Sequence, residues 1–234
     1  MTSFTWLGHS TFHIKVGDGP AILIDPWLKG NPAFPPGYEV APIDLVLITH
    51  GHFDHLDLGD LRSVVEKFEP EIVCNAEISM WLGSKDIPNV VGMNKGGCYH
   101  TKGVRVSMTQ AQHSSSILED GKIIYAGEPA GLVVRQPDGR AFYHAGDTNV
   151  FSDMRLIQRL YAPELAMLPI GDLFTMGPKE AALACEFLQP KLVIPIHYKT
   201  FPALTGTAAK LREELGAESG VEVRELEPGA AFVW

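Results

Sequence analysis

The sequence predicts an α/β fold in which two mixed β-sheets pack face to face, with helices on the outside. Short apolar segments alternate with segments of helical periodicity throughout the 234 residues, a pattern typical of α/β domains. Hairpin-like pairs of strands near the start of each half favour two mixed sheets over one parallel, doubly wound sheet. Because no linker or change in composition interrupts the chain, we expect one domain over residues 1–234, built from two related halves, about residues 1–118 and 119–234.

The first half contains apolar or alternating segments that predict strands, and two segments that predict helices. Asp57 is a suitable N-cap for the first helix, in which Leu58, Leu61 and Val65 recur at helical spacing. Residues 29–42 are rich in proline and glycine, which predicts a long irregular loop. The expected strands are residues 3–7, 10–16, 21–25, 44–48, 71–74 and 103–109, and the expected helices are residues 58–68 and 76–83.

The second half repeats this scheme. We expect Ser152 to cap one helix and Pro178 to open another, because proline is favoured in the first helical turn. A glycine-rich loop at residues 171–177 precedes the second of these helices. The expected strands are residues 122–125, 131–135, 140–144, 165–169, 192–196, 222–226 and 230–233, and the expected helices are residues 153–161, 178–188 and 207–215.

Composition excludes several classes of partner. The formal net charge is −9 and the chain has no run of lysine or arginine, so we expect neither a nucleic acid nor a membrane as partner. The N-terminal residues lack the basic start and apolar stretch of a signal peptide, and no segment approaches the roughly 20 apolar residues of a membrane span. Cys74, Cys98 and Cys185 are few and far apart, which predicts buried thiols and a cytoplasmic location.

The stretch from Thr49 to His55 carries the strongest chemical signal in the chain. His50, His52, Asp54 and His55 follow directly after an apolar strand. Alternate residues of an extended segment point to the same side, so His50 and His52 can aim their imidazoles at one point. Four ligands so close together exceed what one tetrahedral ion takes from a single loop. We therefore expect two neighbouring metal ions, each completed by residues from elsewhere.

Three further side chains that can bind metal ions follow predicted strands in the same way. They are His113, Asp147 and His197. Together with the four residues of the loop they form a set of five histidines and two aspartates, which one end of a β-sandwich could gather. Imidazole and carboxylate ligands suit zinc best, with manganese, iron and nickel as alternatives. We expect two divalent metal ions, and zinc as the first candidate.

With these residues the chain resembles the metallo-β-lactamase superfamily of metal-dependent hydrolases. The resemblance rests on the HxHxDH motif at residues 50–55, then His113, then Gly146-Asp147-Thr148 and then His197, in that order. It implies a four-layer αββα sandwich with a dinuclear metal site at the edge of the two sheets. By this analogy the first ion is bound by His50, His52 and His113, the second by Asp54, His55 and His197, and both by Asp147.

Three shorter segments are similar to a narrower branch of the superfamily, the short, single-domain hydrolases that include ascorbate-6-phosphate lactonase-like and phospholipase-D-like members. These segments are Trp6-Leu7-Gly8-His9-Ser10, Ala145-Gly146-Asp147-Thr148 and Thr175-Met176-Gly177-Pro178. We expect hydrolysis of an ester, lactone or phosphodiester bond in a small-molecule substrate by a metal-bridging hydroxide, which Asp54 orients. Two alternatives are a metal-binding sensor or scaffold without turnover, and an iron-dependent redox enzyme with the same ligands.

Three residues near these motifs have two interpretations each. His9 is either a structural histidine or a catalytic residue that binds substrate or protonates the leaving group. The branch resemblance favours catalysis, because its Gly-His-Ser element lies beside the site. His144 is expected to support the site or the core rather than bind metal, and Lys199 either reaches an anionic substrate group or is solvated. The superfamily often forms homo-oligomers, although no coiled-coil pattern predicts one here.

Overall fold

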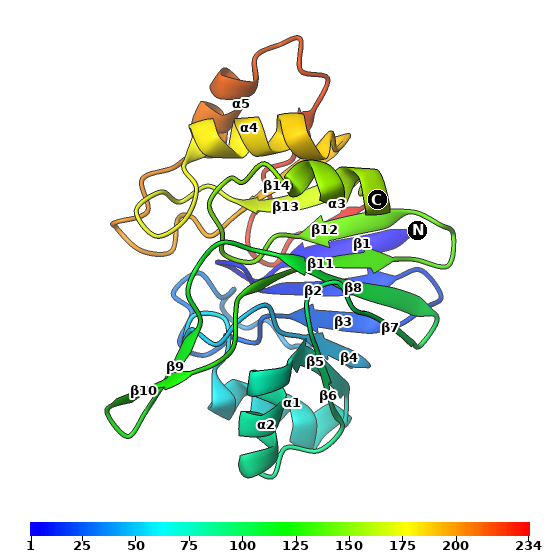
Figure 1. Cartoon of the computed structure of the whole chain (residues 1–234), viewed down its shortest axis with the longest axis vertical. Helices are drawn as coiled ribbons and strands as arrows, with labels where there is room; N and C mark the ends of the chain where they lie inside the picture. The colour runs from blue at the N-terminus through cyan, green and yellow to red at the C-terminus, as the bar shows by residue number, and fades with distance from the viewer.

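The computed structural model describes all residues, 1–234, and contains two seven-stranded β-sheets that pack face to face (Figure 1). In spatial order the first sheet consists of β16 (Ala231–Val233), β1 (Thr2–Trp6), β2 (Phe12–Val16), β3 (Ala21–Ile24), β4 (Leu45–Leu47), β5 (Glu71–Asn75) and β6 (Val90–Met93). The second consists of β15 (Glu222–Val223), β14 (Leu192–Ile196), β13 (Leu165–Pro169), β12 (Ala141–His144), β11 (Ala130–Arg135), β8 (Val104–Gln110) and β7 (Cys98–Thr101).

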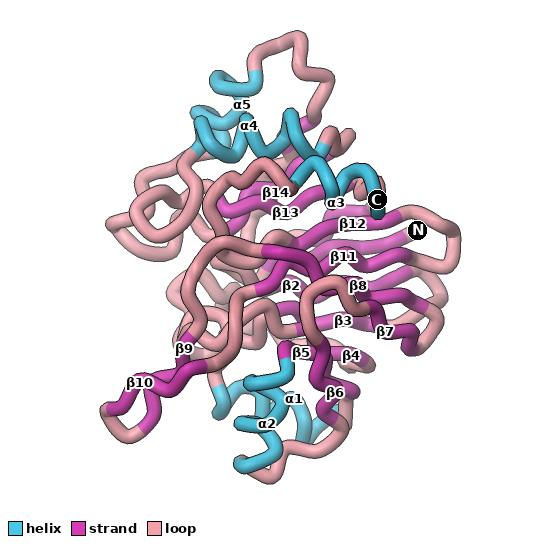
Figure 2. The backbone as a smooth tube through the Cα atoms, viewed as in Figure 1, coloured by secondary structure: helices cyan, strands magenta, loops and turns pink.

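Five helices cover the outer faces, so the predicted four-layer αββα sandwich is confirmed (Figures 1 and 2). Two of them lie against the first sheet, namely α1 (Leu58–Phe68) and α2 (Ala76–Ser84). Three lie on the side of the second sheet, namely α3 (Met154–Tyr161), α4 (Pro178–Leu188) and α5 (Ala208–Leu215). A separate hairpin of β9 (Ser116–Glu119) and β10 (Lys122–Tyr125) projects from the sandwich (Figure 2).

The two sheets share one pattern of strand directions. In the first sheet β1, β2 and β3 are antiparallel neighbours, whereas β3, β4, β5 and β6 run parallel. In the second sheet β7, β8, β11 and β12 are antiparallel, and β12, β13, β14 and β15 run parallel. The carboxyl ends of parallel strands meet at one edge of a sheet, which is where α/β folds bind their ligands.

Apolar side chains between the sheets form the main core. Phe4 of β1 meets Phe142 of β12 edge to face across the interface, with ring centroids 5.2 Å apart. The rings are fully buried, and each such aromatic pair contributes about 0.5–1.5 kcal/mol beyond its buried area. A second cluster joins the outer side of the first sheet to its helices through Val46, Leu61 and Ile78. The core therefore holds the strand ends that carry the site in a fixed arrangement.

Most predicted elements are present, and the differences have local causes. Strands β6, β7 and β9 were not expected, because their residues are largely half-buried or exposed. Asp57 caps α1 as predicted, since its carboxylate accepts the backbone N–H of Asp60 at 2.8 Å. The prediction for Ser152 is wrong, because α3 begins after Asp153 without a side-chain cap.

Two predictions from composition can be compared with the structure. Cys74 and Cys185 are buried free thiols, as expected, whereas Cys98 is exposed because it lies on the edge strand β7. None of the helices is both long and apolar enough to cross a membrane.

Candidate metal centre

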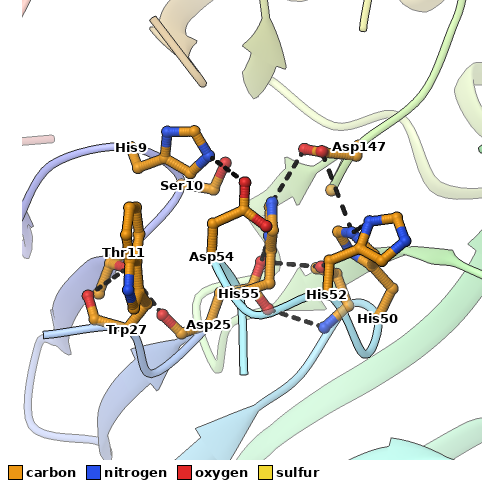
Figure 3. Close-up of polar contacts among 12 residues, drawn as sticks. His9, Ser10, Thr11, Asp25, Trp27, His50, His52, Asp54, His55 and Asp147 are labelled. Carbon is orange, nitrogen blue, oxygen red and sulfur yellow. Dashed lines mark hydrogen bonds and ion pairs between the residues drawn. The ribbon is translucent and has the colours of Figure 1, made fainter. Parts of the chain in front are cut away.

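The structure brings all seven predicted ligands together at the carboxyl ends of four strands, and Figure 3 labels His50, His52, Asp54, His55 and Asp147. The loop after β4 carries four of them, and the loops after β8, β12 and β14 carry one each. The seven residues are His50, His52, Asp54, His55, His113, Asp147 and His197. His50, His55, His197 and Asp147 form the buried floor, while Asp54 and His113 are 14% and 16% exposed and border the opening.

Three histidines converge on one side of the cluster. The Nε2 atom of His50 lies 3.1 Å from Nδ1 of His52, and one ring nitrogen from each of these two and from His113 lies within 4.8 Å of the others. Nitrogens bound to one tetrahedral zinc ion at about 2.0–2.1 Å are separated by about 3.3 Å. The imidazole pair is therefore already at the spacing that a shared ion requires.

The other side of the cluster contains Asp54. Ligand atoms of Asp54, His55 and His197 lie within 4.8 Å of one another, in a group that His9 completes. Asp147 lies between the two sides, with its Oδ1 3.2 Å from Nε2 of His55 and its Oδ2 3.0 Å from Nε2 of His197. The same Oδ2 is 3.6 Å from Nε2 of His113, so this carboxylate faces histidines of both sides.

Asp25, which the sequence analysis did not select, orients two of the histidines. Its buried Oδ2 accepts hydrogen bonds from Nδ1–H of His55 and from the Thr49 hydroxyl, both at 2.7 Å, and its Oδ1 accepts the Thr49 backbone N–H at 2.8 Å. Because the Thr49 hydroxyl donates its only hydrogen to Asp25, it accepts from Nδ1–H of His50 at 3.1 Å. In both rings Nε2 therefore points into the cluster, as carboxylate–histidine pairs arrange it in metal sites.

His52 faces the cluster through Nδ1 rather than Nε2. Its Nδ1 faces His50, whereas its Nε2 lies 3.4 Å from the hydroxyl of Ser114, the residue after His113. A ring that donates Nε2–H to Ser114 has its free lone pair on Nδ1, toward the cluster. Each of the three histidine rings on the loop, His50, His52 and His55, therefore has one nitrogen in contact with a partner outside the cluster. Its other nitrogen has a free lone pair that faces the cluster.

The charges of the cluster favour a cation at its centre. Burial alone lowers the pKa of His55, but Asp147 and Asp25 outweigh it and hold this pKa well above the usual range. Burial opposes ionisation of Asp147, yet His197 and His55 hold its pKa well below the usual value. Burial keeps the pKa of His50 well below its usual value, so that ring is neutral and free to bind.

The same residues fit metal ions chemically. Nε2 of His55 and Oδ1 of Asp147 are buried and have no hydrogen-bond partner, although unpaired buried polar atoms are costly. Both atoms face the cluster, which Figure 3 shows for the His55–Asp147 contact. Nitrogen and carboxylate ligands of this kind suit zinc and related divalent ions, and an ion would satisfy both orphaned atoms.

His9 is held beside Asp54 at the rim of the cluster. Its Nε2 lies 3.1 Å from Oδ2 of Asp54 and its Nδ1 lies 3.0 Å from Oγ1 of Thr200 (Figure 3 shows the first contact). Burial lowers the pKa of His9 to about 4. Because a carboxylate can only accept, Nε2–H of His9 donates to Asp54, while the Thr200 hydroxyl lies 3.0 Å from His9 Nδ1 and 3.1 Å from Tyr198 O. The hydrogen bond from His9, against the opposing effect of burial, helps hold the pKa of Asp54 at about 2.

Left-handed backbone conformations aim three side chains at the cluster. His9, Asp25 and His197 have φ values of 55°, 52° and 54°, a region that residues other than glycine adopt seldom. Such conformations cost of the order of 1–3 kcal/mol each and concentrate at functional sites. Before His9, Gly8 has φ 96° and its missing Cβ leaves room for Ala33, which a Cβ would meet at 2.8 Å.

The two remaining candidates have structural contacts. His144 is fully buried, and its Nε2–H donates to Ser10 O at 2.9 Å while its Nδ1 accepts the Gly146 N–H at 3.1 Å. It therefore joins the turn that carries His9 to the loop that carries Asp147. The ammonium of Lys199 pairs with the Glu225 carboxylate at 2.8 Å.

Most of the residues that hold the predicted ligands in place belong to no recognisable metal-binding motif. Asp25, Thr49, Ser114 and Thr200 are single polar residues at the ends of strands or in loops. Asp25 offers one usable signal, since a charged residue that ends an apolar strand needs a buried partner. The other three are ordinary loop residues by sequence alone.

Comparisons with known proteins agree with this geometry. Residues 21–198 match the family model of the beta-lactamase superfamily domain. The chain is 51% identical to a UPF0173 metal-dependent hydrolase of Solibacter usitatus, over 98% of this chain and 99% of that one. It is 46% identical to another of Koribacter versatilis, over 97% and 96% of the two chains.

Solved structures show the same relationship. Igni18, a metallo hydrolase from the archaeon Ignicoccus hospitalis, superposes with a TM-score of 0.85 at 35% identity over 100% of both chains. An isothiocyanate hydrolase from Delia radicum gut bacteria shares the fold, with a TM-score of 0.73 at 22% identity over 99% of this chain and 98% of that one. The site geometry, the family match and these relatives lead to one assignment: the chain belongs to the beta-lactamase superfamily, among its metal-dependent hydrolases.

Proposed function

We propose that this hydrolase holds two divalent metal ions, zinc before manganese, iron or nickel, and cleaves an ester, lactone or phosphodiester bond in a small molecule. The position of Asp147 carries the proposal, because its carboxylate oxygens lie 3.0 Å and 3.2 Å from His197 and His55 and 3.6 Å from His113. A carboxylate so placed can be shared by two ions. His50, His52 and His113 would complete one ion, and Asp54, His55 and His197 the other.

Bound there, the ions would supply a nucleophile from water at neutral pH and polarise the bond to be cleaved. The chain's own residues would position the reactants. Asp54, on the open side of the cluster, would accept a hydrogen bond from the attacking water and orient it. His9 donates its Nε2–H to Asp54 Oδ2, and in this way it would hold the carboxylate in place.

His9 has a second role in the proposal. Its ring is fully buried and its Nε2–H is donated to Asp54 Oδ2, so it would exchange this contact for the leaving group of a bound substrate and stabilise the charge that develops there. The Asp54 carboxylate can only accept, so it fixes Nε2 as the nitrogen that carries the hydrogen. We therefore assign His9 and Asp54 as the catalytic pair, and the seven-residue set as the metal ligands.

The test measures metal content and turnover on the same sample. Protein purified without chelator would be analysed for elements, then assayed with a p-nitrophenyl phosphodiester, a carboxyl ester and a lactone before and after chelation. We expect about two ions per chain and turnover that chelator abolishes and zinc restores. A protein that keeps full activity after complete metal removal would contradict the proposal. Two ions without turnover of any substrate would instead support a sensor.

A further inference from the structure

Three aromatic rings pack in a row beside His9, and we call this row the aromatic wall. It consists of Trp27 after β3, Phe53 in the metal-binding loop and Phe201 after β14. Trp27 lies with its ring centroid 5.9 Å from that of Phe53 and 5.9 Å from that of Phe201. The wall reaches His9, whose ring centroid is 5.2 Å from that of Trp27 and 5.6 Å from that of Phe201.

The exposure of Phe53 distinguishes the wall from ordinary core packing. Its side chain is 66% exposed, whereas Trp27 behind it is 3% exposed. Phe53 stands between two predicted ligands, His52 and Asp54, on the side where the cluster opens. An exposed apolar surface next to a reactive centre is typical of a ligand-binding site. The wall therefore offers an apolar face to whatever approaches Asp54.

None of the ion pairs of the site involves lysine or arginine. Every ion pair of the seven ligands and His9 joins a histidine to an aspartate. The nearest candidate from the sequence, Lys199, pairs with Glu225 at 2.8 Å and Glu227 at 3.8 Å. Recognition of a phosphate distant from the scissile bond normally uses arginine or lysine, and neither is paired with the carboxylates of the site.

We infer that the substrate is a carboxyl ester or lactone whose acyl part is uncharged and apolar, aromatic or branched, and that this part lies on the aromatic wall. The inference rests on the proposed function and selects among its bond types. Offset or edge-to-face contacts with Phe53 and Phe201 would hold such a group, and would direct its carbonyl carbon toward Asp54. A phosphorylated sugar would gain no such contact from the exposed Phe53 ring.

The first test compares two esters with the same leaving group, p-nitrophenyl acetate and p-nitrophenyl phenylacetate, on zinc-loaded protein. Burying the extra ring predicts that kcat/KM for phenylacetate exceeds that for acetate by about tenfold. Phe53→Ala lowers this ratio to about two or less, and Phe53→Leu gives an intermediate ratio. Leu160→Ala is the matched control, because Leu160 on α3 is similarly exposed at 68% and lies outside the site. A ratio near one in the unsubstituted protein, or an unchanged ratio in Phe53→Ala, would overturn the inference.

The second test measures binding by calorimetry, independently of turnover. We expect phenylacetate to bind the zinc-loaded protein about tenfold more tightly than acetate, and glucose 6-phosphate to bind no more tightly than inorganic phosphate. Phe53→Ala should abolish the preference for phenylacetate. If the preference is found without hydrolysis of either ester, the wall is supported and the hydrolysis of carboxyl esters fails. If both esters are hydrolysed without any preference in rate or binding, the hydrolase is supported and the wall is refuted.

Discussion

Replacing Asp25 by asparagine should weaken metal binding without removing any ligand. The carboxylate accepts three hydrogen bonds through Oδ1 and Oδ2, from the Thr49 N–H, the Thr49 hydroxyl and the His55 ring. With Oδ1 of the asparagine kept on the Thr49 N–H, the amide NH₂ takes the place of Oδ2 and faces two donors. To relieve this, His55 must move its hydrogen to Nε2, and the Thr49 hydroxyl must turn to donate to His50 Nδ1. Both changes place a hydrogen on the nitrogen that points into the cluster.

The expected loss can be worked out from these contacts. Loss of one carboxylate partner of a ligating histidine lowers metal affinity by about 10- to 100-fold. Here one substitution affects one histidine on each side of the cluster, so both ions should bind about 10- to 100-fold more weakly, or about 1.4–2.7 kcal/mol each. The folded protein should also lose about 1–3 kcal/mol of stability, because a buried donor is left unpaired.

Competition with a chromophoric chelator would measure the two affinities, and thermal unfolding of the metal-free protein would measure the stability. Asp60→Asn is the matched control. Asp60 is also a buried carboxylate, accepting the backbone N–H groups of Leu28 and Lys29 at 2.6 Å and 3.0 Å, but it contacts no histidine. A folded Asp25→Asn protein that binds both ions as tightly as the unsubstituted chain would refute the reasoning.

Three further substitutions test other parts of the site. Asp147→Ala should lower metal content from about two ions per chain to one or none in elemental analysis; retention of two would show that this carboxylate is not shared. His144→Ala leaves the buried Ser10 C=O and Gly146 N–H without partners, so it should cost about 2–5 kcal/mol in chemical unfolding, and an unchanged midpoint would contradict its bridging role. Thr200→Val removes one neutral hydrogen bond from His9, which predicts about a fivefold lower kcat. Thr200→Ser keeps the hydroxyl and should restore the rate. Equal rates in both variants would exclude this contact from catalysis.

The predictable part of the site is the part whose chemistry is local in sequence. His50, His52, Asp54 and His55 lie within six residues after a strand, and few structures other than a metal site tolerate that arrangement at a buried strand end. His113, Asp147 and His197 were predicted because each also follows a strand. The general rule that ligands bind at the carboxyl ends of strands then brings the four segments together.

The fold was predictable for a related reason. Buried strands such as β4, β13 and β14 are continuous apolar runs, and α1 has a clear helical spacing. The strands that were missed are the edge strands β6 and β7 and the projecting β9, whose side chains face solvent on at least one side. Apolar and polar residues alternate along a strand only when one of its faces is buried, so a strand without a buried face lacks this signal.

The hydrogen bonds that select the ring nitrogen of each histidine could not be predicted, because they depend on which strands are neighbours. Asp25 and Thr49 are 24 residues apart, and they meet only because β3 and β4 are parallel and in register, with Ile24 opposite Leu47. Asp25 then follows β3 at the level where the metal-binding loop follows β4. A shift of register by one residue would reverse the face on which each side chain lies and would separate this carboxylate from both histidines. The ligand types of this site are thus a property of the sequence, whereas their protonation, and with it the ability to bind metal, is a property of the sheet.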